Sequence, residues 1–155
     1  MLTALSAIAL LGCQAEETLE GQETVPGVIE VEAEPVDLDV VSAWTELDTY
    51  GSSDFIDAQA IVHNNGDYAA TFSVSLTMIN EAGAQAGSIE GEYKMTTEYV
   101  VEPGEEVDVY EGILAPPMAS GTCSWQIRVT VLDETREDVD RDNNKASSNT
   151  FSVGG

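Results

Sequence analysis

Basic residues are scarce in this sequence: 5 Lys and Arg stand against 29 Asp and Glu, which gives a formal net charge of -24. Such a negative chain repels nucleic acid and anionic lipid head groups, so we expect no nucleic-acid partner. It attracts divalent cations or basic partners, and it stays soluble. The acid excess is equally compatible with solubility alone and with a salty habitat, where dissolved ions screen surface carboxylates.

Histidine and cysteine, which often carry catalysis or bind metals, are also scarce. His63 is the one histidine, and it falls on the outward phase of a predicted strand, which is typical of a surface histidine. Cys123 shares a predicted strand face with Trp125 and Ile127, which favours a buried, inert thiol. The sequence also lacks a serine elbow, a glycine-rich phosphate loop and His/Cys metal spacing. We therefore predict that the chain is not an enzyme and has neither catalytic nor cofactor-binding residues.

A short apolar run, Leu2 to Leu11, opens the chain. It has the length of the apolar core of a signal peptide and is too short to span a bilayer. It ends in Leu11-Gly12-Cys13, which resembles the lipobox of bacterial lipoproteins. The resemblance implies that residues 1–12 are a signal peptide and that Cys13 is lipidated and anchors the protein in a membrane. A plain secretory signal with an incidental cysteine is the alternative.

Residues 13–35 contain seven Glu but no basic residue and no aromatic. Mutual repulsion and the lack of core-forming side chains predict an extended, disordered tether. A solvated spacer is favoured here over a binding tail. Gln14 takes the place of the Asp that keeps enterobacterial lipoproteins at the inner membrane. The lipobox resemblance therefore implies the outer membrane or the cell surface.

From Val36 onward, apolar and polar residues alternate with the period of two that marks half-buried strands. The alternating segments are 38–40, 56–62, 72–78, 107–109, 123–131 and 151–153, with a less clear one inside 89–101. Turn residues such as Asn64-Asn65-Gly66-Asp67 and Pro103-Gly104 separate them. No segment shows a helical stripe. About seven strands at this spacing predict an all-β, two-sheet sandwich over residues 36–155.

Several motifs in a fixed order carry a family resemblance. They are Val36-Asp37-Leu38, Val62-x-Asn64-x-Gly66, Phe72-x-Val74-x-Leu76, Pro103-Gly104-Glu105, and Val129-x-Val131-x-Asp133 leading to Asn143-Asn144. Together they resemble CARDB, the cell-adhesion-related domain found in bacteria. The resemblance implies an immunoglobulin-like sandwich that serves adhesion, spacing or assembly at a surface. One position departs from the family, because Arg141 stands where a Glu is usual.

The acidic loop, residues 133–144, is the one constellation in the sequence that predicts a metal. Asp138, Asp140 and Asp142 stand at alternate positions, and calcium takes six to eight oxygen ligands. The pattern is not that of an EF-hand, because Asn143 and Asn149 take the places of its Gly and Glu. A solvated acidic turn whose Asn side chains cap the backbone is favoured over this calcium site.

These observations leave two candidate functions. The first is a cell-envelope lipoprotein that presents a non-catalytic module for adhesion, scaffolding or binding of a protein or glycan partner. The second is a surface lipoprotein that binds calcium or a small ligand at the acidic loop.

Overall fold

The computed structural model describes residues 32–80, 92–115 and 121–154. The predicted signal peptide, Cys13 and the tether up to residue 31 lie outside these residues. The described residues form eleven β-strands and no helix, so they include no helix long and apolar enough to cross a membrane. The predicted all-β class is confirmed.

The strands vary from three to eleven residues in length. In chain order they are β1 (Glu34–Val36), β2 (Leu38–Trp44), β3 (Thr49–Gly51), β4 (Phe55–Asn64), β5 (Ala70–Asn80), β6 (Tyr93–Val101), β7 (Glu106–Leu114), β8 (Gly121–Val131), β9 (Arg136–Asp138), β10 (Lys145–Ser147) and β11 (Phe151–Gly154). Strands β2, β4, β5, β6, β7, β8 and β11 have four residues or more, in agreement with the predicted seven. The other four are too short to show an alternation.

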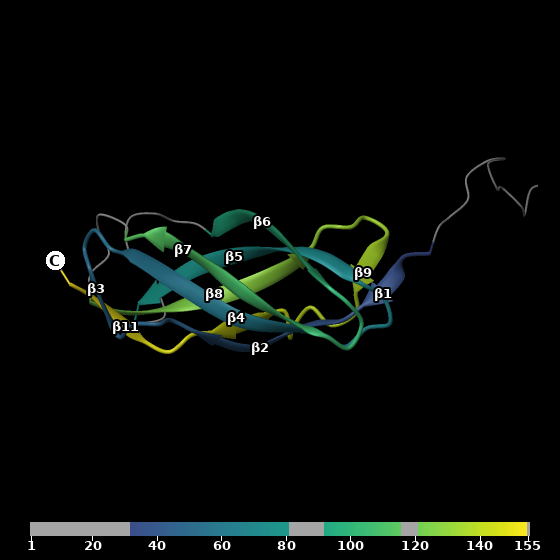
Figure 1. The fold of residues 1–155 in the computed structure, drawn as a ribbon, viewed down its shortest axis with the longest axis horizontal. Coiled ribbons are helices and arrows are strands. Elements are labelled where there is room, and N and C mark those ends of the chain that lie inside the picture. The colour runs from purple at the N-terminus through teal and green to yellow at the C-terminus, as the bar shows by residue number, and fades with distance from the viewer. Residues whose placement is uncertain (1–31, 81–91, 116–120, 155) are drawn as a thin grey trace, which may run out of the picture. The chain divides into compact units, whose positions relative to one another are not determined.

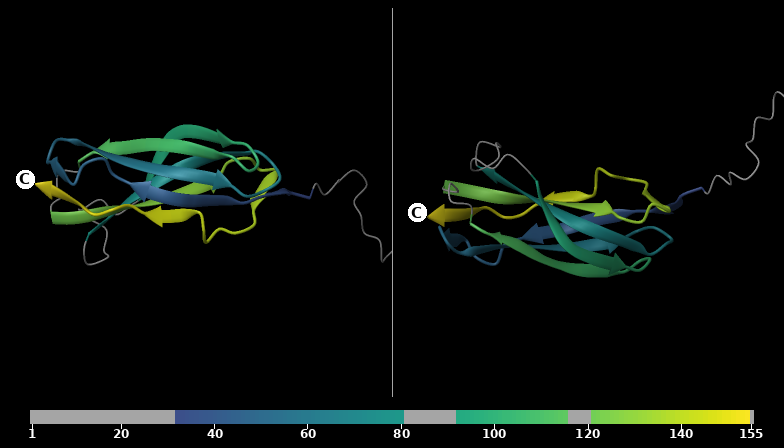
Figure 2. Two further views of the ribbon diagram at one scale, coloured as in Figure 1. Left: turned by 60° about the horizontal axis from the view of Figure 1, so that its bottom comes forward. Right: turned by 90° about the horizontal axis from the view of Figure 1, so that it is seen from above.

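Two sheets form the layers of the sandwich (Figures 1 and 2). The larger sheet has the order β3-β11-β8-β5-β6, with β10 also paired to β8, and the smaller sheet has the order β2-β4-β7. Strands β1 and β9 form a separate parallel pair. The long central strands β4, β5 and β8 pair in antiparallel register with their neighbours, as expected for a sandwich built from alternating strands.

The core lies between the two sheets and includes most of the residues that the alternation places inside. The largest fully buried side chains include Trp125, Tyr50, Phe72, Phe151, Leu38 and Ile56. Trp125 also joins the layers, because its indole Nε1 in β8 donates a hydrogen bond of 2.9 Å to the backbone oxygen of Asp57 in β4. The prediction that Cys123 is buried is confirmed.

The structure differs from the sequence prediction at the start of the domain. Strand β1 begins at Glu34, two residues before the predicted start at Val36. The acidic loop is also not continuous, because Arg136–Asp138 form strand β9 and pair with Glu34–Val36. Both differences have one cause: a pair of three-residue strands 102 residues apart in sequence (Glu34 and Arg136) has no local signal in either partner.

Gly66 illustrates a second difference, in the turn after β4. No described residue other than glycine has a positive φ, and Gly66 does not have one either. A Cβ at position 66 would lie 2.8 Å from the Cα of Val36. Residues 64–67 were recognised as a turn because such residues tolerate a positive φ, but close approach of two backbones is what requires the glycine. Gly104, with φ +73°, does take the conformation expected of a Pro-Gly turn.

Candidate functional site

The carboxylates of the acidic loop are used mainly to hold its backbone. Asp138 is buried; its Oδ2 accepts a hydrogen bond of 3.3 Å from Leu38 N, and its Oδ1 accepts one of 3.1 Å from Asp140 N. Asp140 Oδ1 in turn accepts a hydrogen bond of 3.0 Å from Asp142 N. These consecutive bonds from a carboxylate to the backbone two residues on are Asx turns.

This arrangement fits a capped turn better than a calcium centre. Within the described ranges, no group of three or more His, Cys, Asp or Glu side chains could hold a metal ion. The structure therefore does not bring Asp138, Asp140 and Asp142 together as a ligand set. Calcium at this loop stays a prediction.

A pocket of about 440 Å³ lies beside the acidic loop and against β8. Its volume is in the range of small-molecule binding sites, roughly 300–1,000 Å³. Its basic lining residues are Arg128, Arg136, Arg141 and Lys145, and its acidic ones are Glu137, Asp138 and Asp142. Thus four of the five Lys and Arg of the whole chain line one pocket.

Strand register places two of these cations face to face. Arg128 of β8 and Lys145 of β10 are directly paired, and both are exposed on the outer side of the sheet because Ile127 and Val129 point into the core. The ion pairs found among the described residues involve neither of them. Both positive charges are therefore available to a ligand.

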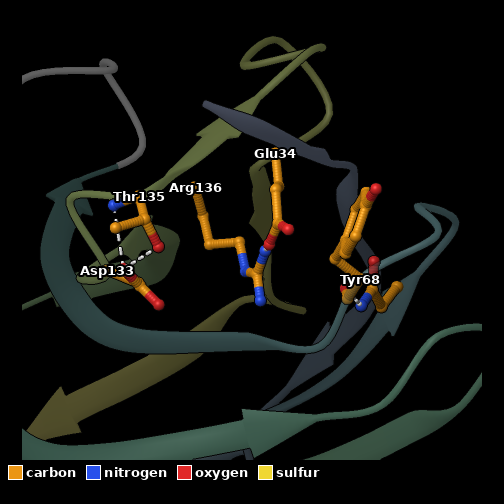
Figure 3. A network of polar contacts seen from close by, with 6 residues as sticks. Glu34, Tyr68, Asp133, Thr135 and Arg136 are labelled. Atoms are coloured by element: carbon orange, nitrogen blue, oxygen red, sulfur yellow. Dashed lines mark hydrogen bonds and ion pairs between the residues drawn. The ribbon is translucent and has the colours of Figure 1, made fainter. Parts of the chain in front are cut away.

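The other two cations of the pocket, Arg136 and Arg141, each form an ion pair with a glutamate. Arg136 forms an ion pair with Glu34 of β1, and its guanidinium carbon lies 4.9 Å from the ring centroid of Tyr68. Figure 3 shows the guanidinium beside the end of the Glu34 side chain, with the Tyr68 ring to the right. Arg141 Nη2 lies 3.6 Å from Glu137 Oε1, and both side chains are exposed. An ion pair exposed to water contributes little to stability.

The turn before β9 is fixed by Asp133 and Thr135 (Figure 3). Asp133 Oδ1 accepts hydrogen bonds of 2.8 Å from Thr135 N and 2.7 Å from Thr135 Oγ1. These donors stabilise the ionised form, so they lower the pKa of the Asp133 carboxyl. Arg136, which lines the pocket, follows this turn directly in the chain.

Asn144 adds a polar group without a partner to the pocket. It is 6% exposed and lines the pocket, while its side-chain Oδ1 has no hydrogen-bond partner among the described residues. A buried amide oxygen left unpaired is unfavourable, by about 1–3 kcal/mol. Because this oxygen has almost no accessible surface, it is not open to a ligand in the pocket.

His63 lies away from the pocket, near the turn after β4. Its Nδ1 is 2.7 Å from Asn65 Oδ1, and in the sheet it pairs with Asp39 and Glu106. It therefore lies on the outer phase of β4, as the alternation predicts.

Sequence reasoning concentrated on the acids of this region and missed its cations. A signal was present, because Arg128, Arg136, Arg141 and Lys145 fall within one stretch of a chain that has a single other cation, Lys94. What the sequence could not show is that β10 returns beside β8 and places Lys145 opposite Arg128.

No family model matches this sequence, and no curated protein matches it. Several solved structures are similar. The CARDB domain of a Pyrococcus furiosus protein, solved in complex with di-metal ions, matches 84% of this chain and 99% of its own, with 18% identity and a TM-score of 0.49.

Two other similar structures are parts of larger enzymes. A cycloisomaltooligosaccharide glucanotransferase of Paenibacillus sp., solved with cycloisomaltoheptaose, matches 77% of this chain at 14% identity and a TM-score of 0.50. A β-glucosidase of Erythrobacter marinus matches 77% at 15% identity and a TM-score of 0.49. This chain spans only 14% and 16% of those two chains.

At these identities, the likenesses concern the fold. With its two facing sheets, the chain is an all-β sandwich of the immunoglobulin-like type. A CARDB domain stands among the similar structures, as the resemblance stated from the sequence implied. Because one sandwich fold hosts many functions, the function has to be argued from the pocket itself.

Proposed function

We propose that this chain is a non-catalytic binding module of the bacterial cell envelope, which offers a pocket on the outer side of β8 and β10 to a protein or glycan partner. One observation carries the proposal: most of the scarce cations of a chain with net charge -24 converge on that pocket. Exposed charges without partners on a rigid sheet are suited to recognition, because they favour a complementary ligand over others.

Anchoring is the second part of the proposal. Lipidation at Cys13 would hold the module at the membrane, since each buried methylene contributes about 0.8 kcal/mol and two or three acyl chains suffice for a stable anchor. The acidic tether that precedes β1 would hold it away from the surface. The proposed location is the outer membrane or the cell surface.

Fractionation tests the anchor. Cys13→Ser in the full chain, expressed in a bacterial host with lipoprotein export, should move the protein from the membrane to the soluble fraction. Cys123→Ser is the matched control and should leave it in the membrane. Retention of Cys13→Ser in the membrane at the wild-type level would contradict the lipobox interpretation.

Capture from envelope extract tests the binding role. We expect the immobilised full chain to retain an envelope component and Arg128→Gln to retain less of it, with the same result whether calcium or a chelator is present. A chain that captures nothing above a blank surface would contradict the proposed function.

A further inference from the structure

The cations of this chain are gathered on one side of the molecule. Lys145 pairs with Arg128, Arg128 pairs with Ser75, and Ser75 pairs with Lys94. Neighbouring strands are about 4.8 Å apart, so these positions form one row of about 14 Å across the larger sheet. Arg136 and Arg141 line the same pocket as two members of this row, Arg128 and Lys145.

Arg128 and Lys145 are two positive charges on directly paired positions, so they repel each other. Like charges directly opposite each other on an antiparallel pair are destabilising. With 29 carboxylates in the chain, pairing each cation with an acid would have been the stabilising arrangement. Acids line the pocket around this pair, but neither cation has an acid as its direct partner between β8 and β10, and a locally unfavourable arrangement of this kind is typical of a functional site. An anion between the two side chains would turn their repulsion into attraction.

The rest of the lining limits the charge of that anion. Glu137 and Asp142 also line the pocket, so a multiply charged group such as phosphate would meet repulsion from them. The same carboxylates accept hydrogen bonds from hydroxyl groups. A ligand with one carboxylate and several hydroxyls therefore fits the two cations and the neighbouring carboxylates together.

We propose that the pocket binds an acidic sugar, a hexuronate unit, with its carboxylate between Arg128 and Lys145 and its hydroxyls toward Glu137 and Asp142. Arginine is suited to this task because its planar guanidinium pairs with a carboxylate through two parallel hydrogen bonds. A volume of about 440 Å³ accommodates a monosaccharide unit. This inference rests on the proposed function and names the class of its ligand.

Calorimetric titration of the full chain with D-glucuronate tests the inference, at about 10 mM ionic strength to limit screening. We expect binding of D-glucuronate, and at least tenfold weaker binding of D-glucose and of inorganic phosphate. Arg128→Gln and Lys145→Gln should each weaken glucuronate binding at least tenfold. Lys94→Gln removes the same charge from the same row outside the pocket, and should change binding less than twofold. Thermal unfolding verifies that each variant folds.

Three outcomes would overturn the inference. They are no binding of D-glucuronate, binding of phosphate as tight as that of D-glucuronate, and an equal loss in Arg128→Gln and Lys94→Gln, which would mean that net charge alone attracts the anion. Envelope capture that is reduced in Arg128→Gln, together with absent glucuronate binding, would overturn the sugar site while leaving the binding module in place. Loss of all capture would reject the module itself.

Discussion

The two outer faces of the sandwich differ in charge although the strands behind them follow the same alternation. The cationic face, on the outer side of β10, β8, β5 and β6, carries Lys145, Arg128 and Lys94. The acidic face, on the outer side of β2, β4 and β7, carries residues such as Glu106 and Asp108, with no Lys or Arg. The inner positions of both sheets are apolar and buried.

The faces also differ in what their charged groups do. On the acidic face, Asp57 is 4% exposed and serves the structure: it accepts hydrogen bonds from the Tyr50 hydroxyl, Glu46 N and Gln59 Nε2. On the cationic face, Arg128 and Lys145 take part in neither of the ion pairs found among the described residues. Charge on the acidic face therefore maintains the fold, whereas charge on the cationic face is available for binding.

Removing Trp125, which links the two sheets, should have the largest effect on stability. Trp125→Ala empties a fully buried site and removes the hydrogen bond to Asp57 O, so we expect a loss of about 3–5 kcal/mol in the free energy of unfolding. Tyr110→Ala, an aromatic that is 56% exposed on the acidic face, is the control and should lose less than about 1 kcal/mol. Urea denaturation measures both. A loss below about 1 kcal/mol for Trp125→Ala would contradict the strand phase.

A smaller effect should follow from Tyr50→Phe, which tests the structural use of acid on the acidic face. The change removes the hydroxyl donor to Asp57 and should lower the free energy of unfolding by about 1–3 kcal/mol, because a buried carboxylate loses a partner. Phe151, whose ring packs edge-on to Tyr50, should keep the phenyl ring in place. Unchanged stability in Tyr50→Phe would mean that this hydrogen bond does not support the fold.

Alkaline pH probes the same contact. Burial and the hydrogen bond to Asp57 raise the pKa of Tyr50 to about 12 from 10.0. The folded state therefore keeps this proton where the unfolded state loses it, so the stabilisation is complete below pH 10 and declines as the pH rises toward 12. Tyr50→Phe should make the decline shallower in unfolding experiments between pH 9 and 12. Tyr99, whose pKa burial and Glu111 also raise to about 12, should account for part of the remaining slope.

Salt should raise the thermal stability of the protein by screening the repulsion between its carboxylates. With a net charge of -24, we expect the wild-type Tm to rise by several degrees from low to molar sodium chloride, because ions screen the carboxylates. Asp108→Asn on the acidic face should raise the low-salt Tm by about 1–2 °C, which corresponds to a few tenths of a kcal/mol. Gln59→Asn on the same face leaves the charge unchanged and should not alter the salt response. A Tm independent of salt would contradict this account.

Calcium should have the smallest specific effect. Because the Asx turns occupy Asp138 and Asp140, we expect calcium and magnesium to raise the Tm equally, through general screening. Asp140→Asn combined with Asp142→Asn should leave the two responses equal. Greater stabilisation by calcium than by magnesium, lost in the double variant, would instead support a calcium site, since magnesium prefers a smaller octahedral shell.

Alternation in the sequence was sufficient to predict the fold class and much of the core. Ile56 to Val62, Phe72 to Met78 and Cys123 to Val129 are buried at the predicted alternate positions. A side chain on a strand points to one side or the other, so a local pattern determines which residues are inside. The strands missed by this reasoning, such as β3 and β9, have three residues each and depend on partners far along the chain.

The pocket was only partly predictable. The acidic loop was recognised from its composition, which left open a calcium site and a capped turn. Three of its carboxylates, those of Asp133, Asp138 and Asp140, accept backbone N–H groups. Local hydrogen bonds of this kind form whenever the turn closes, and they compete with metal binding for the same oxygens. The cations were visible as residues, yet their convergence was not.

The sequence by itself determined what depends on neighbours along the chain: the all-β class, the inward phase of each long strand, the charge of -24 and the resemblance to CARDB. Tertiary structure alone decided what depends on strand partners, namely that β10 pairs with β8, that β9 pairs with β1, and that Lys145 faces Arg128. The physical reason is that the side of a strand on which a residue lies is a property of the local backbone. The residue beside it on the next strand is selected by the packing of the whole sandwich.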